Sequence, residues 1–156
     1  MDSYDISKFL HIAAVVIGLG VTFVFPFLQA FAERKGVVAT RFAFQFANRL
    51  TKIVVYPGAV LVALLGVGLI FDDRTGYKDD FPAWLMWSIT WYVIALAVSV
   101  FVMDPATKKA QKILEATPDG AELPDDYIAV GKRIQMVGGL LGVSILGVLF
   151  LMIWKP

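Results

Sequence analysis

The chain has 156 residues, of which 58% are hydrophobic and only 17% are charged, and its formal net charge is +1. A soluble domain of this size carries more charge and shorter apolar runs, so the composition and the mean hydropathy of +0.72 indicate a protein whose solvent is lipid. Cysteine is absent, which excludes disulfides and thiolate metal sites.

Four apolar segments are long enough to cross a membrane, because a helix needs about 20 mostly apolar residues to pass a hydrocarbon core of roughly 30 Å. Together they take up more than half of the chain and leave no room for a separate soluble domain. We therefore expect an all-α polytopic membrane protein, with a single domain over residues 1–156 folded as an antiparallel four-helix bundle. The expected spans are residues 8–32, 53–71, 83–103 and 134–154.

The first of these segments has to be distinguished from a cleaved signal peptide, because residues 30–32, "AFA", imitate a cleavage site. Its apolar stretch is too long for a signal peptide, and its leader, "MDSYDISK", is acidic rather than basic. We expect an uncleaved first span.

The lysines and arginines near the span ends predict the orientation, because such residues accumulate on the cytoplasmic side. Ten of them lie in the connections between spans one and two and between spans three and four, against four in the termini and the remaining loop. Both termini are therefore expected outside, in the inner membrane of a bacterium. Trp84, Trp87 and Trp154 agree, since they fall near the predicted outer ends of spans three and four, where an indole keeps its N–H hydrated.

The first basic connection is expected to be helical rather than a plain loop. Phe42, Phe46 and Leu50 follow one another at helical spacing, with basic residues such as Arg41 elsewhere around the helix. This pattern suits an amphipathic extension of span two at the lipid headgroups. Recognition of a particular lipid and simple solvation by the basic residues are both open readings.

The second basic connection contains two helix boundaries. Asp104 is expected to cap a new helix with Pro105 in its first turn, and residues 117–120, "TPDG", are expected to end it. Pro124 then begins the last helix, followed by two carboxylates. Neither basic connection contains a phosphate-binding glycine-rich loop or a nucleic-acid motif.

Helices in lipid associate through close backbone approach and polar contacts, because lipid supplies no hydrophobic drive. Gly138 and Gly142 form a GxxxG arrangement in span four, which predicts a packing seam inside the bundle, with a dimer contact as the alternative. Pro26 and Pro57 remove backbone donors within apolar runs and are expected to kink their helices.

His11, the only histidine, is the exception in spans that carry no Asp, Glu, Lys or Arg near their middle. Without such charges a proton relay, a voltage sensor or an ion-coupled transporter is disfavoured. His11 lies about 6 Å inside the outer boundary if span one enters the membrane near Ser7. Met86 and Met152 fall in the same outer layer, and imidazole with thioether sulfur suits haem iron or copper.

A structural role for these three side chains is the alternative to ligand binding. The histidine can hydrogen-bond to a neighbouring helix or to headgroup water, and methionine is an ordinary filler of helix bundles. We expect His11 to face the bundle interior, because the small residues Ala14 and Gly18 follow it on one helical face. With one histidine in the chain, a bis-histidine haem would require a symmetric dimer.

The last part of the chain carries a resemblance to a known family. The stretch "AELPDDYIAVGKRIQMVGGLLGV" and the ending "LFLMIWKP" resemble a bacterial family of predicted four-span integral membrane proteins whose function is unassigned. The opening "FLHIAAVVIGLG" and the string "PGAVLVALLGVGL" in span two fit the same family. The likeness covers essentially the whole chain, and the ending is its most specific part.

A more distant resemblance is to the HemJ-type protoporphyrinogen oxidases and the CopD-like membrane proteins of copper resistance. There too an early "LHI" histidine opens span one, and "KP" closes the last span. The resemblance implies that His11 is associated with haem. It also implies that Arg49 and Lys52 are the basic residues before the second span, and that Pro57 and Gly66 are its structural marks.

The sequence departs from the HemJ-type pattern where that family carries a functional lysine in span three. The segment "WLMWSITW" contains no basic residue, and Ser88 or a neighbour stands at the lysine's place. An asparagine–glutamate pair expected in the last span is also missing from "IQMVGGLLG". The departures weaken an enzymatic reading and leave haem or metal binding open.

Two hypotheses follow from the sequence. In the first, the protein binds haem, another porphyrin or copper through His11 near the outer membrane face. In the second, it is a non-enzymatic accessory or assembly subunit of a membrane complex and binds no cofactor. Its partners beyond the lipid bilayer would be a second copy or the other members of such a complex.

Overall fold

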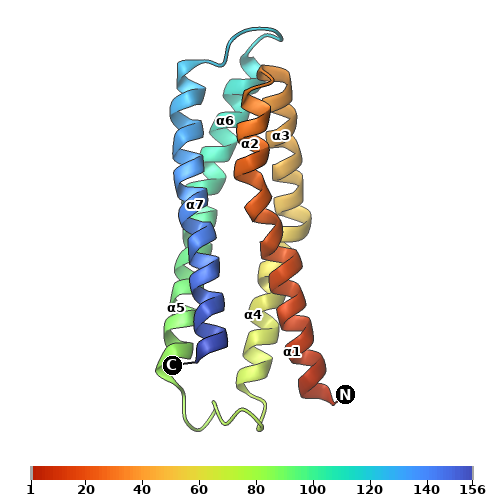
Figure 1. The fold of residues 1–156 in the computed structure, drawn as a ribbon, viewed down its shortest axis with the longest axis vertical. Helices are drawn as coiled ribbons and strands as arrows, with labels where there is room; N and C mark the ends of the chain where they lie inside the picture. Colours follow the sequence, from red (N-terminus) through yellow and green to blue (C-terminus); the bar gives the residue numbers. More distant parts are fainter. Residues whose placement is uncertain (1, 156) are drawn as a thin grey trace.

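The computed structural model describes residues 2–155, and these residues form one bundle of four long helices (Figure 1). Each helix is longer than the roughly 20 residues that a membrane core requires, so each has room to extend beyond it. The expected all-α membrane bundle is confirmed, and the helices reach farther than the predicted apolar spans. The four continuous helices are Ser3–Glu33, Val37–Ile70, Ala83–Ala116 and Asp125–Trp154.

The two ends of the bundle differ in what they carry (Figure 1). One end, here called the termini end, holds both chain termini and the loop over residues 71–82. The opposite end, here called the basic end, holds the turn over residues 34–36 and the loop over residues 117–124.

Three of the four helices change their hydrogen-bond pattern along their length, whereas the fourth, α7 (Asp125–Trp154), is a single α-helix. The changes are short π or 3₁₀ segments that join two α-helical parts. The first helix is α1 (Ser3–Ala14), η1 (Val15–Leu19), η2 (Gly20–Val24) and α2 (Phe25–Glu33); the second is α3 (Val37–Leu50), η3 (Thr51–Val55) and α4 (Tyr56–Ile70); the third is α5 (Ala83–Val98), η4 (Ser99–Met103) and α6 (Asp104–Ala116).

These irregular segments come directly before prolines. Pro26, Pro57 and Pro105 each stand at the first turn of the α-helical part that follows such a segment. The Tyr56 and Asp104 N–H groups, which immediately precede prolines, donate to carbonyls five residues earlier. A proline has no N–H to give, so a wider π turn keeps the chain helical while changing its hydrogen-bond partners.

The predicted helix start at Asp104 is wrong. Asp104 has helical backbone neighbours, makes no side-chain cap, and the helix runs through it from Ala83 to Ala116. Its carboxylate pairs instead with Lys108 at 2.6 Å. The predicted end in residues 117–120 is confirmed, since Thr117 has extended backbone.

The densest packing lies at the basic end, where α3, α6 and α7 meet. Buried side chains form one cluster there, with the Phe44 and Tyr127 rings in an edge-to-face contact at 5.8 Å between centroids. Arg41 of α3 lies beside this cluster. Its guanidinium donates to the carbonyls of Leu114 (3.0 and 3.1 Å) and Thr117 (2.7 Å), and so satisfies the end of α6.

Toward the termini end the helices associate as two pairs, α1 with α4 and α5 with α7 (Figure 1). In the first pair the backbones touch: a Cβ built on Gly18 would lie 2.7 Å from the Gly58 Cα. This is the close approach that small residues permit in lipid. The predicted seam glycines of α7 also face other helices, but side chains cover them, Met103 over Gly138 and Phe23 over Gly142.

The outer surface of the bundle is apolar over most of its length. Large side chains such as Phe27, Phe101 and Ile153 are exposed, and no more than 17% of any span's most apolar window is buried inside the bundle. Exposed apolar surface of this extent requires a nonpolar surrounding. In the first helix, Phe9, Leu10 and Ile17 are among these exposed side chains.

Candidate functional site

A cavity of about 1040 Å³ lies between the two helix pairs. It extends from Tyr4 and Tyr77 at the termini end to Gln29 and Asn48 toward the basic end, and most of its wall is apolar. Ligand sites in proteins typically have volumes of about 300–1,000 Å³ and a few polar groups in an apolar wall. The size and lining of this cavity are those of a site for one large, mainly apolar molecule.

His11 lies in the wall of this cavity, as its expected inward orientation requires. It comes from α1 and packs on α4 at Gly66: a Cβ built on Gly66 would lie 3.2 Å from the imidazole Cε1 and 3.6 Å from Nδ1. Gly66 therefore provides the space that the ring occupies. Gly66, which the resemblance to the HemJ-type proteins implies to be structural, is thus the residue against which the His11 ring packs.

The Nδ1 atom of His11 is buried and has no hydrogen-bond partner among residues 2–155. The Val62 carbonyl of α4 is the backbone acceptor beside the imidazole. The other ring nitrogen, Nε2, is not among the atoms within 4 Å of the Gly66 position. The Cε1–Nδ1 edge of the ring thus lies against Gly66 of α4, and Nε2 is more than 4 Å from the Cβ position there.

The two methionines proposed as ligands are separated by the fold. Met152 of α7 lines the same cavity as His11. Met86 of α5 is 52% exposed on the outside of the bundle and is absent from the cavity wall. Arg49 and Lys52 are also exposed and outside the cavity wall, so the structure brings only Met152 together with the histidine.

Three polar side chains in the cavity wall are hydrogen-bonded to backbone carbonyls of the protein. Ser88 donates to the Trp84 carbonyl at 2.8 Å, and Ser144 donates to the Leu140 carbonyl at 2.9 Å. The Tyr92 hydroxyl donates to the Ala59 carbonyl at 2.7 Å. In contrast to these groups, the His11 imidazole has a buried nitrogen without a partner.

At its termini end the cavity is bordered by two lysines and by the loop over residues 71–82. Lys8 and Lys155 both line the cavity, as does Tyr77 of the loop. The Lys155 ammonium donates to the Tyr77 hydroxyl at 3.2 Å and lies 5.7 Å from the centroid of the Trp84 ring. Of the tryptophans predicted at this end, Trp84 is buried here, whereas Trp87 and Trp154 are exposed.

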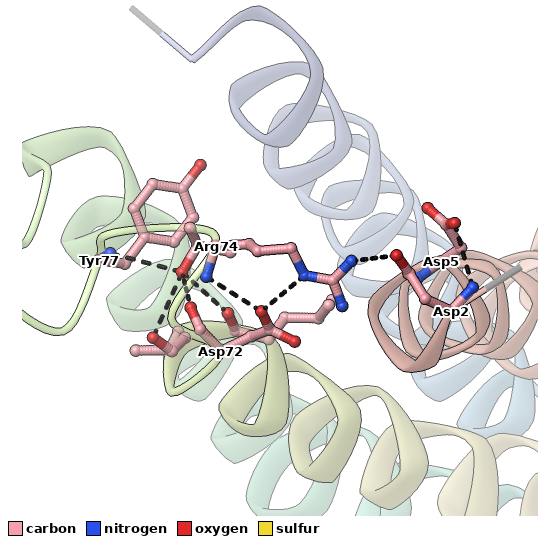
Figure 2. A network of polar contacts seen from close by, with 8 residues as sticks. Asp2, Asp5, Asp72, Arg74 and Tyr77 are labelled. Carbon is pink, nitrogen blue, oxygen red and sulfur yellow. Dashed lines mark hydrogen bonds and ion pairs between the residues drawn. The ribbon is translucent and has the colours of Figure 1, made fainter.

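The same loop is tied to the start of α1 by a network around Arg74 (Figure 2). The Arg74 guanidinium pairs with Asp2, the residue that caps α1, and with Asp72 in its own loop. Hydrogen bonding from Arg74 holds the pKa of the Asp2 carboxyl below its ordinary value, and the same bond raises the pKa of Arg74. Of the cations near the mouth of the cavity, Arg74 is therefore already neutralised.

The chain matches a known protein family. Residues 5–156 match the family described as predicted integral membrane protein (DUF2269). The chain belongs to this family. Membership and the four apolar helices together make it a multi-pass integral membrane protein. No curated protein and no solved structure matches the chain, and the distant likeness to the HemJ-type and CopD-like proteins stays a prediction.

One polar cluster of this DUF2269 member was missed by the sequence reasoning. The Glu33 carboxylate accepts hydrogen bonds from Tyr127 (2.7 Å), Gln29 (2.8 Å) and Gln135 (3.5 Å), and so joins α2 to α7. Gln29 is 6% exposed and lines the basic end of the cavity. A glutamine four residues before a glutamate, in an otherwise apolar helix, was the available signal, because buried amides require partners.

Proposed function

We propose that this protein binds a tetrapyrrole, haem in the first instance, between its two helix pairs, with the His11 imidazole as an axial ligand. The observation that carries the proposal is the position of the only histidine in the wall of an apolar cavity of about 1040 Å³. A broad planar macrocycle suits a space between two helix pairs that packing leaves open. The histidine imidazole is a common axial ligand of the iron in haem proteins.

The surroundings of the ring support its role as a ligand. An imidazole that binds a metal usually gives its other N–H to a carbonyl or carboxylate, which fixes the tautomer and the ring orientation. The Nδ1 side of His11 faces α4, where the Val62 carbonyl is beside the ring. A small shift of the ring would complete that hydrogen bond and leave Nε2 for iron. Met152 is the candidate for the second axial position, since it lines the same cavity.

The donor set favours haem over copper, the other ligand expected from the sequence. Copper depends on several protein donors, and thioethers favour Cu(I). The cavity wall contains one imidazole and two thioethers, and of these thioethers Met103 packs against the buried cluster at the basic end. Residues 2–155 contain no cluster of three or more His, Asp or Glu side chains suited to a metal. Haem brings four of its own nitrogen ligands and requires only one or two from the protein.

The proposal is one of binding rather than of porphyrinogen oxidation, because the stretch "WLMWSITW", where the HemJ-type lysine is expected, contains no basic residue. The excess of Lys and Arg at the basic end supports an orientation with both termini outside the cell. In a bacterial plasma membrane, the His11 layer would then lie near the outer face. A homodimer or a larger membrane complex is compatible with this site but is not required by it.

The test is the visible absorption spectrum of protein purified in mild detergent from haem-replete cells. Wild-type protein is expected to show a Soret band, and His11→Ala is expected to lose it while its melting curve stays cooperative. Met86→Leu is the matched control, because Met86 lies on the outer surface; its spectrum should equal that of the wild type. A Soret band that is unchanged in His11→Ala would refute the ligand role. Wild-type protein without a Soret band, even after incubation with excess haem, would favour the accessory subunit without a cofactor.

A further inference from the structure

We infer that the termini end of the cavity is an anion site, in which Lys8 and Lys155 receive the acidic groups of the bound molecule. The inference rests on the proposed function and adds the orientation of the ligand: its carboxylates lie at the termini end and its apolar edge points toward the basic end. The chemical class is therefore an amphipathic tetrapyrrole dicarboxylate rather than a neutral or fully apolar macrocycle.

The first support is that both lysines border the cavity without an acidic partner. Lys8 comes from α1 and Lys155 from the end of α7, so they approach the mouth from the two different helix pairs. Neither forms an ion pair with Asp or Glu among the described residues, whereas the nearby Arg74 pairs with both Asp2 and Asp72. Two ammonium groups without a carboxylate partner favour an anion directly beside them. The attraction is local to the two lysines, because the same end also carries Asp2, Asp5 and the four aspartates of the loop over residues 71–82.

The second support is that aromatic rings hold these ammonium groups. Lys155 lies 5.8 Å from the centroid of the Tyr77 ring and 5.7 Å from that of Trp84, and it donates to the Tyr77 hydroxyl. Lys8 lies 5.9 Å from the centroid of the Tyr4 ring. Contacts of this kind orient a lysine without neutralising its charge, so the charge stays available to a ligand.

The third support is the spacing to the two candidate ligands of the iron. Lys8 precedes His11 by three residues on α1, and Lys155 follows Met152 by three residues at the end of α7. One helical turn is about 5.4 Å, so each lysine lies roughly one turn closer to the termini end than the candidate ligand on its own helix. A haem held between His11 and Met152 would have its carboxylate edge beside the lysines if that edge points to the termini end.

The experiment compares the binding of haem with that of haem dimethyl ester, in which both carboxylates are neutral. Wild-type protein is expected to bind haem roughly fivefold to tenfold more tightly than the ester, a modest factor because the lysines are exposed. The preference should shrink as salt is added. In the double variant Lys8→Gln/Lys155→Gln the two affinities should become nearly equal, mainly through weaker binding of haem.

The control is Lys78→Gln/Lys109→Gln, which removes the same charge from two exposed lysines that do not line the cavity and should keep the wild-type preference. A preference for haem that survives in Lys8→Gln/Lys155→Gln, or equal binding of haem and ester by the wild type, would overturn the anion site and leave the proposed function standing. Wild-type protein that binds neither compound would overturn the proposed function, and the anion site with it.

Discussion

Replacing Gly58 by alanine tests the close backbone contact between α4 and η1, the segment that continues α1. A Cβ at residue 58 would lie 2.5 Å from the Gly18 Cα, and real Cβ atoms essentially never approach another atom closer than 3.0 Å. The obstructing atom belongs to a backbone, so no side chain can rotate away. The two helices must separate by at least 0.5 Å, and by nearly 1 Å to restore an ordinary contact of 3.4 Å.

The expected loss of stability follows from the size of this overlap. Overpacking a well-packed contact costs roughly 1–3 kcal/mol, and alanine returns about 0.8–1 kcal/mol because glycine is the poorer helix former. The net loss relative to the wild type is therefore about 0–2 kcal/mol. For a chain of this length that lowers the melting temperature by up to roughly 8 °C.

The matched control is Gly68→Ala, ten residues farther along α4, where a Cβ would have no neighbour within 4 Å. It keeps the helix-propensity gain without the overlap and is expected to melt at the same temperature as the wild type or slightly higher. Thermal unfolding in detergent, followed by circular dichroism at 222 nm, measures both variants. Equal melting temperatures for Gly58→Ala and Gly68→Ala would show that the helices do not touch at Gly18, and the account of this seam would be wrong.

Three further predictions concern other parts of the bundle. Gly66→Leu should displace the His11 imidazole, because even a Cβ at residue 66 lies 3.2 Å from the ring. The NMR signal of this histidine should therefore shift, and an unchanged signal would contradict the contact. Arg41→Gln should speed amide hydrogen exchange at the end of α6, since hydrogen bonds to a charged group contribute about 1.5–3 kcal/mol. The control Arg49→Gln should leave this exchange unchanged, and equal exchange rates in the two variants would refute the capping role of Arg41. Cysteines at the exposed positions Lys78 and Glu122 should react with an impermeant reagent on opposite sides of intact cells, with Lys78→Cys labelled from outside; labelling of both from one side would exclude four spans.

The four helices could be predicted because each consists of a long apolar stretch, and length alone decides whether a segment spans lipid. The inward position of His11 followed from small residues one and two turns along the same face, a local property of one helix. Helix continuity at Asp104 could not be predicted from Asp-Pro, which is a common helix start. The π turn before Pro105 allows the helix to continue through Asp104 and Pro105, and it depends on packing of the whole helix rather than on those two residues.

The contacts between helices were less accessible from the sequence. Gly18 and Gly58 are 40 residues apart, and nothing local to either residue sets the register of α1 against α4. The same is true of Met86 and Met152, which lie at similar predicted depth but face opposite directions in the bundle. Depth in the membrane follows from counting residues, whereas rotation about the helix axis is fixed by neighbours.

The position of the cavity follows from where these contacts fall. The buried cluster around Leu114 and Tyr127 joins α3, α6 and α7 at the basic end. Nearer the termini end, Gly18 draws α1 onto α4, and Trp91 packs on Gly147 to draw α5 onto α7. These contacts act within each pair, and between the pairs the hydrogen bond from Tyr92 to the Ala59 carbonyl and the contact of Phe23 with Gly142 are local. Lipid exerts no hydrophobic force that would press one pair against the other over the rest of their length.

An apolar space of about 1040 Å³ between such pairs has to be filled by something nonpolar, because unfilled walls lose their dispersion contacts. Acyl chains from the bilayer could fill it, but they offer no partner to the buried Nδ1 of His11 or to the two lysines at one end, which have no hydrogen-bond partner and no acidic partner, respectively, among residues 2–155. A tetrapyrrole dicarboxylate accounts for the apolar wall, the imidazole and the lysines together.

Filling by lipid and binding of haem can be distinguished by thermal melting, without any assay of activity. Lipid filling predicts that His11→Leu raises the melting temperature, since it replaces an unsatisfied polar group by an apolar one, and that added haem stabilises neither protein. Ligand binding predicts that haem raises the melting temperature of the wild type and leaves that of His11→Leu unchanged.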